Sequence, residues 1–523
     1  MNPVRLSLLQ EQLEGVAEEM GAALARSAFS PNIRVRLDFS CALFGPQGKL
    51  LAQAAHIPVH LGSMPDQIKV LLSKFEMQPG DLYIGNEPYQ GGTHLPDITL
   101  MKPVFTEEGV SLGMVAARAH HADVGGATPG SMASQSNIYA DGLRIPLVRL
   151  ARQDRWDPHL KELLLSNMRA PRDREGDLLA QQAACRHGEA GLRRVFRQWA
   201  ERDLNKWRGG LAELLNMSSS GTLKALRELF SRGDEEATFS DLLEVGSDQV
   251  PIVVSLRVTE QGRLSADFAG TSGGVAAGFN ATLPVTRAAV CYAVRCLTSQ
   301  QLPLNQGFLD CIEVAAPEGS VVNARYPLAV AAGNVETSQR IVDAVFGALH
   351  RLLPDRVPAA SAGSMNNFSF GFTDPTLGVH YETSGGGAGG APGGSKKALS
   401  GTQVHMTNTL STPSEVLEEE FPVRVERHQT VPGTGGAGEF AGGDGTLKEV
   451  TFLEEASVTF MTTRRSTRPY GLHGGEAGEP GRQLIKRPGE KWTEVEASST
   501  HLLSEGSSVR LQTPGGGGWG RPR

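Results

Sequence analysis

The sequence predicts an α+β protein with a β-hairpin-rich N-terminal part, central helices and a glycine-rich β-strand C-terminal part. Three observations support this prediction. Short runs near both ends alternate apolar and polar residues, residues 158–232 follow a helical period, and glycine accounts for 62 of 523 residues, against about 7% in average proteins. So much glycine indicates tight turns and close backbone approaches rather than a helical bundle.

The N-terminus predicts a helix followed by a hairpin. Leu9, Leu13, Val16 and Met20 recur at four, three and four residues, which is typical of an amphipathic helix. In "DFSCALFGPQGKLLAQ" two apolar runs flank a Gly-Pro-Gln-Gly turn. The opening residues lack the continuous apolar core of a signal peptide and contain glutamates, so a cytoplasmic location is expected.

The middle of the chain predicts helices, then strands, then helices again. Residues 158–232 are expected to be helical with a break at "RAPRDREGD", and "QVPIVVSLRVTEQGRLSADFAGTS" reads as a second hairpin. Helices are expected over "LPVTRAAVCYAVRCLTS" and over "VETSQRIVDAVFGALHRLLP".

After residue 360, glycine clusters separate short alternating runs such as "EVTFLEEASVTFMTT", which indicates strands and turns. Residues 384–401 are the segment expected to form a mobile loop, and "TPGGGGWG" is expected to pack through its backbone. The predicted division of the chain is a metal-binding α+β part at 1–157, a helical segment at 158–235, a central α+β domain at 236–400 and a glycine-rich β domain at 401–523.

Composition excludes several classes of function. A net charge of −7 and a pI near 6.0 argue against a nucleic-acid partner, and no apolar run is long enough to suggest a membrane span. Five cysteines without a CxxC pair argue against a disulfide framework or a thiolate zinc site. A nucleotide-binding GxxxxGK[ST] motif is absent from the sequence, and "GGGAGG" lacks the strand-to-helix context of a dinucleotide site.

The first 150 residues contain an ordered set of potential metal ligands. Such a mixed set of histidines and carboxylates suits Zn²⁺, Mn²⁺ or Fe²⁺ better than Ca²⁺, and a bound ion can lower the pKa of water toward 7. The alternative is that each histidine before a turn is a structural residue. The candidates are Asp38, His56, His60, His94, Asp97, His120, His121 and Asp123.

Three further residues have both a functional and a structural interpretation. Arg144 could bind a substrate carboxylate through two hydrogen bonds, or it could be a surface arginine. Asn334 and Glu336 in "GNVETSQR" could form the polar wall of a channel. The favoured interpretation of that segment is a helix cap supplied by Asn334 and Thr337.

Many segments of this chain resemble the hydantoinase B/oxoprolinase family, which is related to the alpha subunit of acetone carboxylase. They include "NEPYQGGTHLPDITL", "RAHHADVGGATPGSM", "NMRAPRDREGDLLAQQAA", "AGNVETSQRIVDAVFGAL" and "TPGGGGWG". The resemblance implies a division of labour. A separate A-type subunit uses ATP to phosphorylate a ring carbonyl oxygen, and the B-type subunit, which this chain resembles, opens the ring at a single metal ion.

The resemblance also implies roles for residues. The family's two aspartates and two histidines fall on Asp38, His94, Asp97 and His120, with His120 favoured over His121. They would hold one divalent ion, Zn or Mn, while ATP is used by the partner rather than bound here. His121 and Asp123 become candidates for catalytic proton transfer. Arg144, Asn334 and Glu336 remain the candidates for substrate binding.

The leading hypothesis is therefore a B-type subunit of an ATP-dependent cyclic amide hydrolase, a 5-oxoprolinase or an N-methylhydantoinase, working in a hetero-oligomer with the A-type subunit. One alternative is an alpha-type subunit of a ketone carboxylase. Another is a non-catalytic scaffold for the A-type subunit. Val35 and the Asp141-Gly142 pair depart from the family pattern, so the identity of the ring substrate does not follow from the resemblance.

Overall fold

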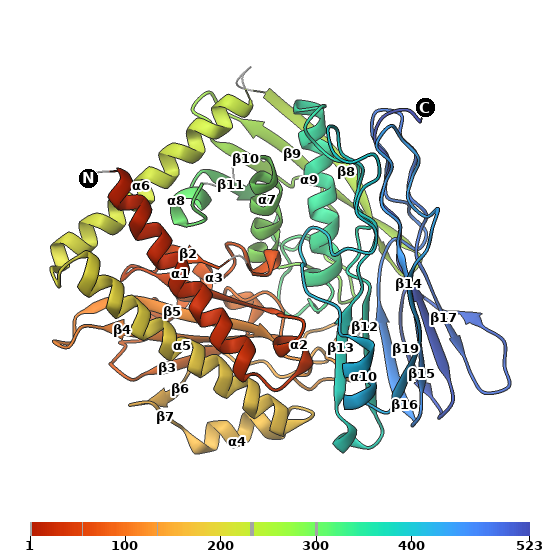
Figure 1. Cartoon of the computed structure of the whole chain (residues 1–523), viewed down its shortest axis with the longest axis horizontal. Coiled ribbons are helices and arrows are strands. Elements are labelled where there is room, and N and C mark those ends of the chain that lie inside the picture. Colours follow the sequence, from red (N-terminus) through yellow and green to blue (C-terminus); the bar gives the residue numbers. More distant parts are fainter. Residues whose placement is uncertain (1–2, 55, 133, 231–234, 299–301, 523) are drawn as a thin grey trace.

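The computed structural model describes residues 3–54, 56–132, 134–230, 235–298 and 302–522. Within these ranges the chain forms four sheets whose strands are mostly antiparallel, together with helices that pack on them (Figure 1). This arrangement confirms the α+β prediction. The N-terminal sheet lies on one side of the molecule, the strands of the C-terminal part lie on the other, and α7 and α9 stand between them.

The N-terminal sheet has seven antiparallel strands in the order β2-β1-β5-β4-β3-β6-β7. The predicted hairpin is confirmed as β1 and β2, which pair antiparallel. Every residue of β1, β2 and β4 is buried, because helices cover both faces of the sheet. The strands are β1 Phe39–Phe44, β2 Leu50–Gln53, β3 Leu82–Gly85, β4 Asp97–Phe105, β5 Ser111–His120, β6 Val148–Arg152 and β7 Arg155–Trp156.

Helices α1 (Pro3–Ser27) and α5 (Pro171–Trp199) share one hydrophobic core with the N-terminal sheet, and α3 (Met64–Lys74) packs in a second core on that sheet. The predicted amphipathic helix is confirmed, since its apolar stripe is buried. Glycines on α5 let α1 approach closely: a Cβ at Gly188 would lie 2.4 Å from the sulfur of Met20, and one at Gly191 would lie 2.6 Å from Val16.

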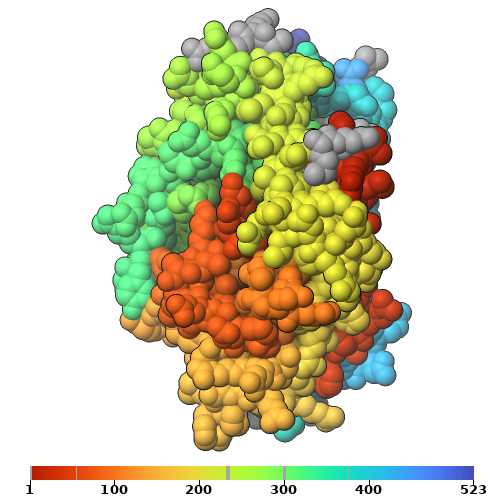
Figure 2. Space-filling view, turned by 90° about the vertical axis from the view of Figure 1, so that its left-hand side faces the viewer, coloured from red at the N-terminus to blue at the C-terminus, as the bar shows by residue number. Residues whose placement is uncertain are grey.

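The range predicted to be helical forms α4 (Pro158–Ser166), α5 and α6 (Leu204–Leu229). The break is shorter than expected, because α5 begins at Pro171 and the remainder of "RAPRDREGD" is helical. Proline is well tolerated in the first turn of a helix, where its missing N–H has no partner to lose. Figure 2 shows the yellow residues of this helical range lying over one face of the molecule beside the orange residues of the N-terminal sheet.

Adjacent glycines on α6 provide a matched test of the packing. A Cβ at Gly209 would meet nothing within 4 Å, whereas one at Gly210 would lie 2.1 Å from the ring of Trp199. Gly209→Ala is expected to raise the free energy of unfolding by about 0.5–1 kcal/mol. Gly210→Ala is expected to lower it by about 1–3 kcal/mol, because Trp199 must move. Urea denaturation of both variants checks this pair, and equal midpoints would contradict it.

The second sheet has the order β11-β10-β9-β8. The predicted hairpin is confirmed as β9 and β10, and α7 and α9 contribute to the core of this part. Both predicted helices are present, although the second begins with a π-helical turn, η3 (Gly333–Thr337). The elements are β8 Glu235–Val245, β9 Asp248–Val258, β10 Leu264–Asp267, β11 Ile312–Ala315, α7 Leu283–Leu297, α8 Gln306–Leu309 and α9 Ser338–Leu352.

Two sheets build the C-terminal part, with orders β13-β12-β16-β19 and β14-β15-β20-β17-β18. A core rich in phenylalanine lies between them. The strands are β12 Asn367–Phe372, β13 Val379–Thr383, β14 Val423–Thr430, β15 Thr446–Phe452, β16 Ala456–Met461, β17 Arg482–Lys486, β18 Thr493–Glu494, β19 Ser498–Leu503 and β20 Ser508–Gln512. The remaining helices are α2 Pro31–Arg34, α10 Ser414–Glu420, η1 Pro58–His60, η2 Pro88–Gln90 and η4 Pro375–Leu377.

Glycine-rich segments pack against one another without forming regular strands. The expectation of a mobile loop is wrong for residues 384–390, which are buried and hydrogen-bonded: Gly387 N donates to Pro514 O at 3.0 Å, and Gly390 N donates to Gly517 O at 2.8 Å. The predicted backbone packing of "TPGGGGWG" is confirmed, since Gly516 N donates to Gly443 O at 2.9 Å. Side chains at these positions would separate the segments and break those bonds.

Two predictions from composition can be compared with the structure. The five cysteines are free, and four of them are buried. None of the helices within the described ranges is both long and apolar enough to cross a membrane.

Candidate functional site

Three predicted site residues meet at one end of the N-terminal sheet because β1, β5 and β4 are antiparallel neighbours. Asp38 precedes β1, His120 ends β5 and Asp97 begins β4. Asp97 and His120 are partners in the strand register, and His120 N donates to Asp38 O at 3.0 Å. Residues from distant parts of the first 120 positions therefore converge because of strand order.

Asp97 lies at the centre of this group and is almost completely buried. His60 Nε2 lies 3.3 Å from its Oδ2, His94 Nε2 lies 3.5 Å from its Oδ1, and the side-chain amide of Asn334 donates to Oδ2 at 3.3 Å. Burial alone would raise the pKa of Asp97. The adjacent His94 and His60 outweigh burial and hold the pKa well below its ordinary value.

Contacts behind the histidine rings fix their orientation. His94 Nδ1 lies 3.1 Å from the carbonyl oxygen of Ala331, so that nitrogen carries the proton and Nε2 keeps its lone pair. His60 Nδ1 lies 2.9 Å from Ser40 Oγ. The His120 ring stacks on Tyr381, with ring centroids 4.4 Å apart and planes inclined by 12°. Burial, followed by the nearby His94, lowers the pKa of His120 well below its usual range.

A cavity of about 10 Å³, which we call the small cavity, lies within this group. That volume holds about one water-sized sphere. Asp38, His60, Asp97, His120 and Asn334 are among the residues that line it. Burial raises the pKa of Asp38, and the positive charge of Arg36 partly offsets that effect.

Four buried atoms in this region have no hydrogen-bond partner among the described residues: His94 Nε2, His120 Nε2, Asp97 Oδ1 and Asn334 Oδ1. Leaving such atoms unpaired costs about 1–3 kcal/mol each, which indicates a missing partner. Within the described part of the chain, no group of three or more His, Cys, Asp or Glu side chains has a geometry that could hold a metal ion as it stands. The donor types suit a divalent ion, and the structure does not itself show a metal-binding part.

His121 and Asp123 lie away from the small cavity. Because side chains alternate along a strand, His121 points to the opposite face of the sheet from His120, where its Nε2 lies 2.9 Å from Gln181 Oε1 on α5. Asp123 accepts backbone hydrogen bonds from Gly125, Gly130 and Arg169 and pairs with the Arg169 guanidinium at 3.0 Å. These contacts give both residues a structural role, and their predicted role in proton transfer stays a prediction.

The pH dependence of stability tests the structural role of His121. Burial lowers the pKa of His121 to about 4, and the nearby Asp177 only partly offsets that effect. The ordinary pKa is near 6.5, so between pH 6.5 and 4 the unfolded chain binds more protons than the folded chain. Stability therefore falls as the pH drops. His121→Gln is expected to remove about 2 kcal/mol of the loss between pH 7 and 5.

Urea denaturation at both pH values measures this difference, with the exposed His159→Gln as the matched control. If His121→Gln keeps the wild-type pH dependence, the structural role is wrong. Turnover by the same variant tests the predicted proton-transfer role separately.

The three predicted substrate-binding residues occupy different positions. Asn334 lines the small cavity. Arg144 is not among the residues that line it. Its Nη2 pairs with Glu87 at 2.8 Å, and its guanidinium lies 4.8 Å from the ring centroid of Tyr326. Glu336 is buried, and burial raises its pKa to about 7. Its Oε1 accepts from Asn367 Nδ2 at 2.8 Å.

The favoured helix-cap interpretation of "GNVETSQR" is wrong. Neither η3 nor α9 has a side-chain cap hydrogen bond. Asn334 instead donates to Asp97, and the Thr337 hydroxyl donates to the carbonyl of Phe279. The π-helical turn shifts these side chains out of cap positions and directs Asn334 toward the small cavity, since such turns interrupt the regular α-helical spacing.

Sequence reasoning left two neighbours of the site outside its predicted set. His60 was a candidate ligand in "HIPVHLGSMP", and η1 brings it to Asp97. Tyr381 had no signal in the sequence, because it lies on β13, far along the chain from His120. The Tyr381 hydroxyl donates to Asn367 Oδ1 at 2.7 Å, which connects it to Glu336.

Comparisons with known proteins agree over the whole chain. The family described as hydantoinase B/oxoprolinase matches residues 2–522. An uncharacterized protein of Methanocaldococcus jannaschii is 37% identical over 100% of this chain and 91% of its own length. The 5-oxoprolinase 1 of Arabidopsis thaliana is 36% identical over 99% of this chain. The chain spans only 42% of that plant protein.

Solved structures show the same fold. The ATP-dependent caprolactamase from Pseudomonas jessenii superposes with a TM-score of 0.89 at 26% identity, covering 100% of this chain and 91% of that one. Acetone carboxylase superposes with a TM-score of 0.91 at 17% identity, covering 99% of this chain and 76% of that one. At that identity the second likeness concerns the fold alone.

Proposed function

The chain belongs to the hydantoinase B/oxoprolinase family, and from this premise we propose that it is the ring-opening subunit of an ATP-dependent cyclic amide hydrolase. The names of its relatives support ring amides as the substrate class, since they include a 5-oxoprolinase, a D-/L-hydantoinase and a caprolactamase. The observation that carries the proposal is the set of buried, unpartnered donor atoms around Asp97. An A-type subunit would supply the ATP-dependent step.

The proposed reaction balances with two water molecules. The partner transfers the terminal phosphoryl group of ATP to the ring carbonyl oxygen and releases ADP. One water then adds to the ring carbon, the carbon–nitrogen bond breaks, and the nitrogen takes up a proton, which leaves an acyl phosphate. A second water cleaves the acyl phosphate to a carboxylate and orthophosphate. Phosphorylation is required because an unactivated amide is a poor electrophile.

The donor set fits one divalent ion, Zn or Mn, held by Asp38, His94, Asp97 and His120, with His60 as a further neighbour. Histidine nitrogens and carboxylate oxygens are the ligands that these ions share. When bound, the ion would supply Lewis acidity that lowers the pKa of water toward 7. The unpartnered Nε2 atoms of His94 and His120 and Oδ1 of Asp97 support this assignment.

The chain's own residues would orient the reacting groups. The Ala331 carbonyl holds the His94 ring in the tautomer whose Nε2 lone pair faces inward. Asn334 is fixed by its hydrogen bond to Asp97, and its unpartnered Oδ1 is free to accept the ring N–H of a substrate. Tyr381 restrains the plane of His120 by stacking. Near-complete burial of Asp97 and His120 excludes bulk water.

Reconstitution with the A-type partner tests the proposed function. We expect the complex to release one amine and one orthophosphate per ring opened, only when both proteins, ATP and a cyclic amide are present. The isolated chain is expected to hydrolyse little cyclic amide. Absence of ring opening by the complex across lactams and hydantoins would overturn the proposal.

The same assay separates the alternatives. Bicarbonate-dependent consumption of a ketone without amine release would identify the carboxylase reaction instead. Full turnover by complexes whose Asp97 or His120 is substituted would identify a scaffold for the A-type subunit.

A further inference from the structure

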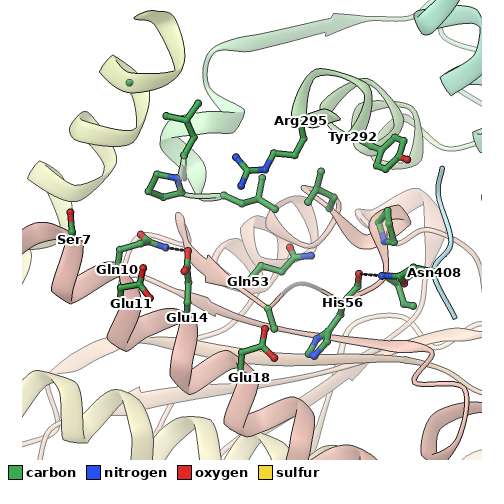
Figure 3. A pocket seen from close by; sticks show the side chains of 18 of the residues that line it. Ser7, Gln10, Glu11, Glu14, Glu18, Gln53, His56, Tyr292, Arg295 and Asn408 are labelled. Carbon is green, nitrogen blue, oxygen red and sulfur yellow. Dashed lines mark hydrogen bonds between the residues drawn. The ribbon is translucent and has the colours of Figure 1, made fainter. Parts of the chain in front are cut away.

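A cavity of about 880 Å³, which we call the large cavity, lies beside the small cavity (Figure 3). Its walls come from α1, α6 and α7, from residues on both sides of η1 and from residues 302–304. This volume lies within the range of small-molecule sites. The small cavity holds about one water, so a ring substrate or its product needs space of this kind nearby.

The two cavities share a wall made of two chain segments, 57–61 and 406–408. Val59 N donates to Met406 O at 3.1 Å and joins the segments. Ile57 lines both cavities. The other residues of the two segments divide between them: Val59, His60, Met406 and Thr407 line the small cavity, whereas Pro58, Leu61 and Asn408 line the large one. The separation is therefore a single layer of chain.

Opposite charges face each other across the large cavity. Glu11, Glu14 and Glu18 lie along α1 on one wall, and Arg295 extends from α7 on the other (Figure 3). Burial raises the pKa of Glu14, and its hydrogen bond from Gln10 at 2.6 Å and the charge of Arg295 partly offset that effect. His56 adds no positive charge at neutral pH, because burial lowers its pKa to about 4.

Gln53 provides independent evidence for a ligand. Its side chain lines the large cavity, is only 7% exposed, and its Oε1 has no hydrogen-bond partner in the described part of the chain. Figure 3 shows Gln53 between the α1 glutamates and Arg295. An amide oxygen only accepts hydrogen bonds, so the missing partner is an N–H or O–H donor. Such a donor would remove the cost of an unpaired buried acceptor.

We propose that the large cavity binds the ring-opened product as a zwitterionic amino acid with one ammonium and one carboxylate group. The ammonium donates to Gln53 Oε1 and Glu14, and the carboxylate pairs with Arg295. This inference rests on the proposed function, because opening a lactam ring with water creates those two groups. Three glutamates against one arginine disfavour a second carboxylate on the ligand.

The proposal also names the substrate class. A neutral lactam gives an amino acid with one carboxylate, which matches the charges of the large cavity. A lactam that carries its own carboxylate gives a dicarboxylate, which the three glutamates would repel. A hydantoin gives a carbamoyl acid without an ammonium group, which leaves Glu14 and Gln53 without a cationic donor. Neutral lactams are therefore the substrates that this site selects.

Calorimetric titration of the purified full chain tests the site without turnover. The probes are 5-aminopentanoate and 6-aminohexanoate, their parent lactams, glutamate and N-carbamoylglycine. We expect the two amino acids to bind at least about 10-fold more tightly than the other probes. Arg295→Gln and Glu14→Gln are each expected to weaken that binding about 10- to 100-fold, since hydrogen bonds between charged groups contribute most. Gln53→Leu is expected to weaken it less.

Two controls keep the test decisive. Glu19→Gln removes a glutamate of α1 that pairs with Arg194 instead of lining the cavity, and it is expected to bind as wild type does. Arg295→Lys retains the charge if Arg295→Gln fails to fold. Equal binding of lactam and amino acid, no binding of either amino acid, or wild-type affinity in folded Arg295 and Glu14 variants would overturn the proposal.

Turnover of lactams by the complex is measured separately. Turnover without amino-acid binding would overturn the assignment of the large cavity alone. Binding without turnover of any cyclic amide would overturn the proposed function, and with it the identity of the ligand as a product.

Discussion

Asp97→Asn is expected to lower the turnover of cyclic amides by the assembled complex about 1,000-fold. Asp97 is the residue on which His60, His94 and Asn334 converge, and the substitution removes the negative charge that would balance a divalent ion. Lewis acidity from a bound ion contributes several kcal/mol to lowering the barrier, and about 4 kcal/mol corresponds to that factor. Turnover with the partner and ATP, together with elemental analysis of metal content, checks this result.

The control for this substitution is Asp248→Asn, at an exposed aspartate that begins β9. It is expected to keep wild-type turnover and metal content. Wild-type protein is expected to hold about one equivalent of Zn or Mn, and an Asp97→Ala/His120→Ala double variant almost none. A metal-free but active wild type would remove the ion from the proposal. An Asp97→Asn variant with full turnover would remove this residue from the site.

Gly516→Ala is expected to destabilise the C-terminal part by about 3 kcal/mol or more, or to prevent folding. A Cβ at this position would lie 2.0 Å from the carbonyl oxygen of Ala388. That oxygen belongs to a backbone segment packed on its neighbours and has no flexible side chain that could move away. Separating the segments would also break the hydrogen bonds from Gly516 N to Gly443 O and from Gly436 N to Gly516 O.

Gly273→Ala is the matched control, because a Cβ at Gly273 would meet nothing within 4 Å. It is expected to leave the free energy of unfolding unchanged or to raise it by up to about 1 kcal/mol. Soluble yield and urea midpoints of both variants decide the matter. Similar midpoints would mean that the glycine segments are less tightly packed than their hydrogen bonds indicate.

Much of the candidate site could be predicted from the sequence. Aspartate and histidine segments occur in order through the first 150 residues, and the antiparallel neighbours β1, β5 and β4 bring Asp38, His120 and Asp97 to one end of a sheet. His94 follows because it lies in the turn before β4. Local patterns were sufficient here because short strands and tight turns determine where their end residues lie.

Other features required contacts between distant segments. His121 differs from His120 by one position, yet strand alternation turns it toward Gln181 on α5. Arg144 is taken up by Glu87 and Tyr326, and Tyr381 reaches His120 from the C-terminal part of the chain. Sequence spacing could not predict these pairings, because they depend on how separate elements pack.

The sequence by itself determined the family, the α+β architecture and the residue types available at the end of the N-terminal sheet, because hydrophobic period and turn chemistry act over a few residues. Only the tertiary structure decided that residues 384–390 are buried against Pro514 and Gly517, and that Asn334 faces Asp97 instead of capping a helix. It also decided that Ile57 separates the small cavity from the large one. Each of these depends on backbone or side-chain packing between segments far apart in the chain, which no local pattern encodes.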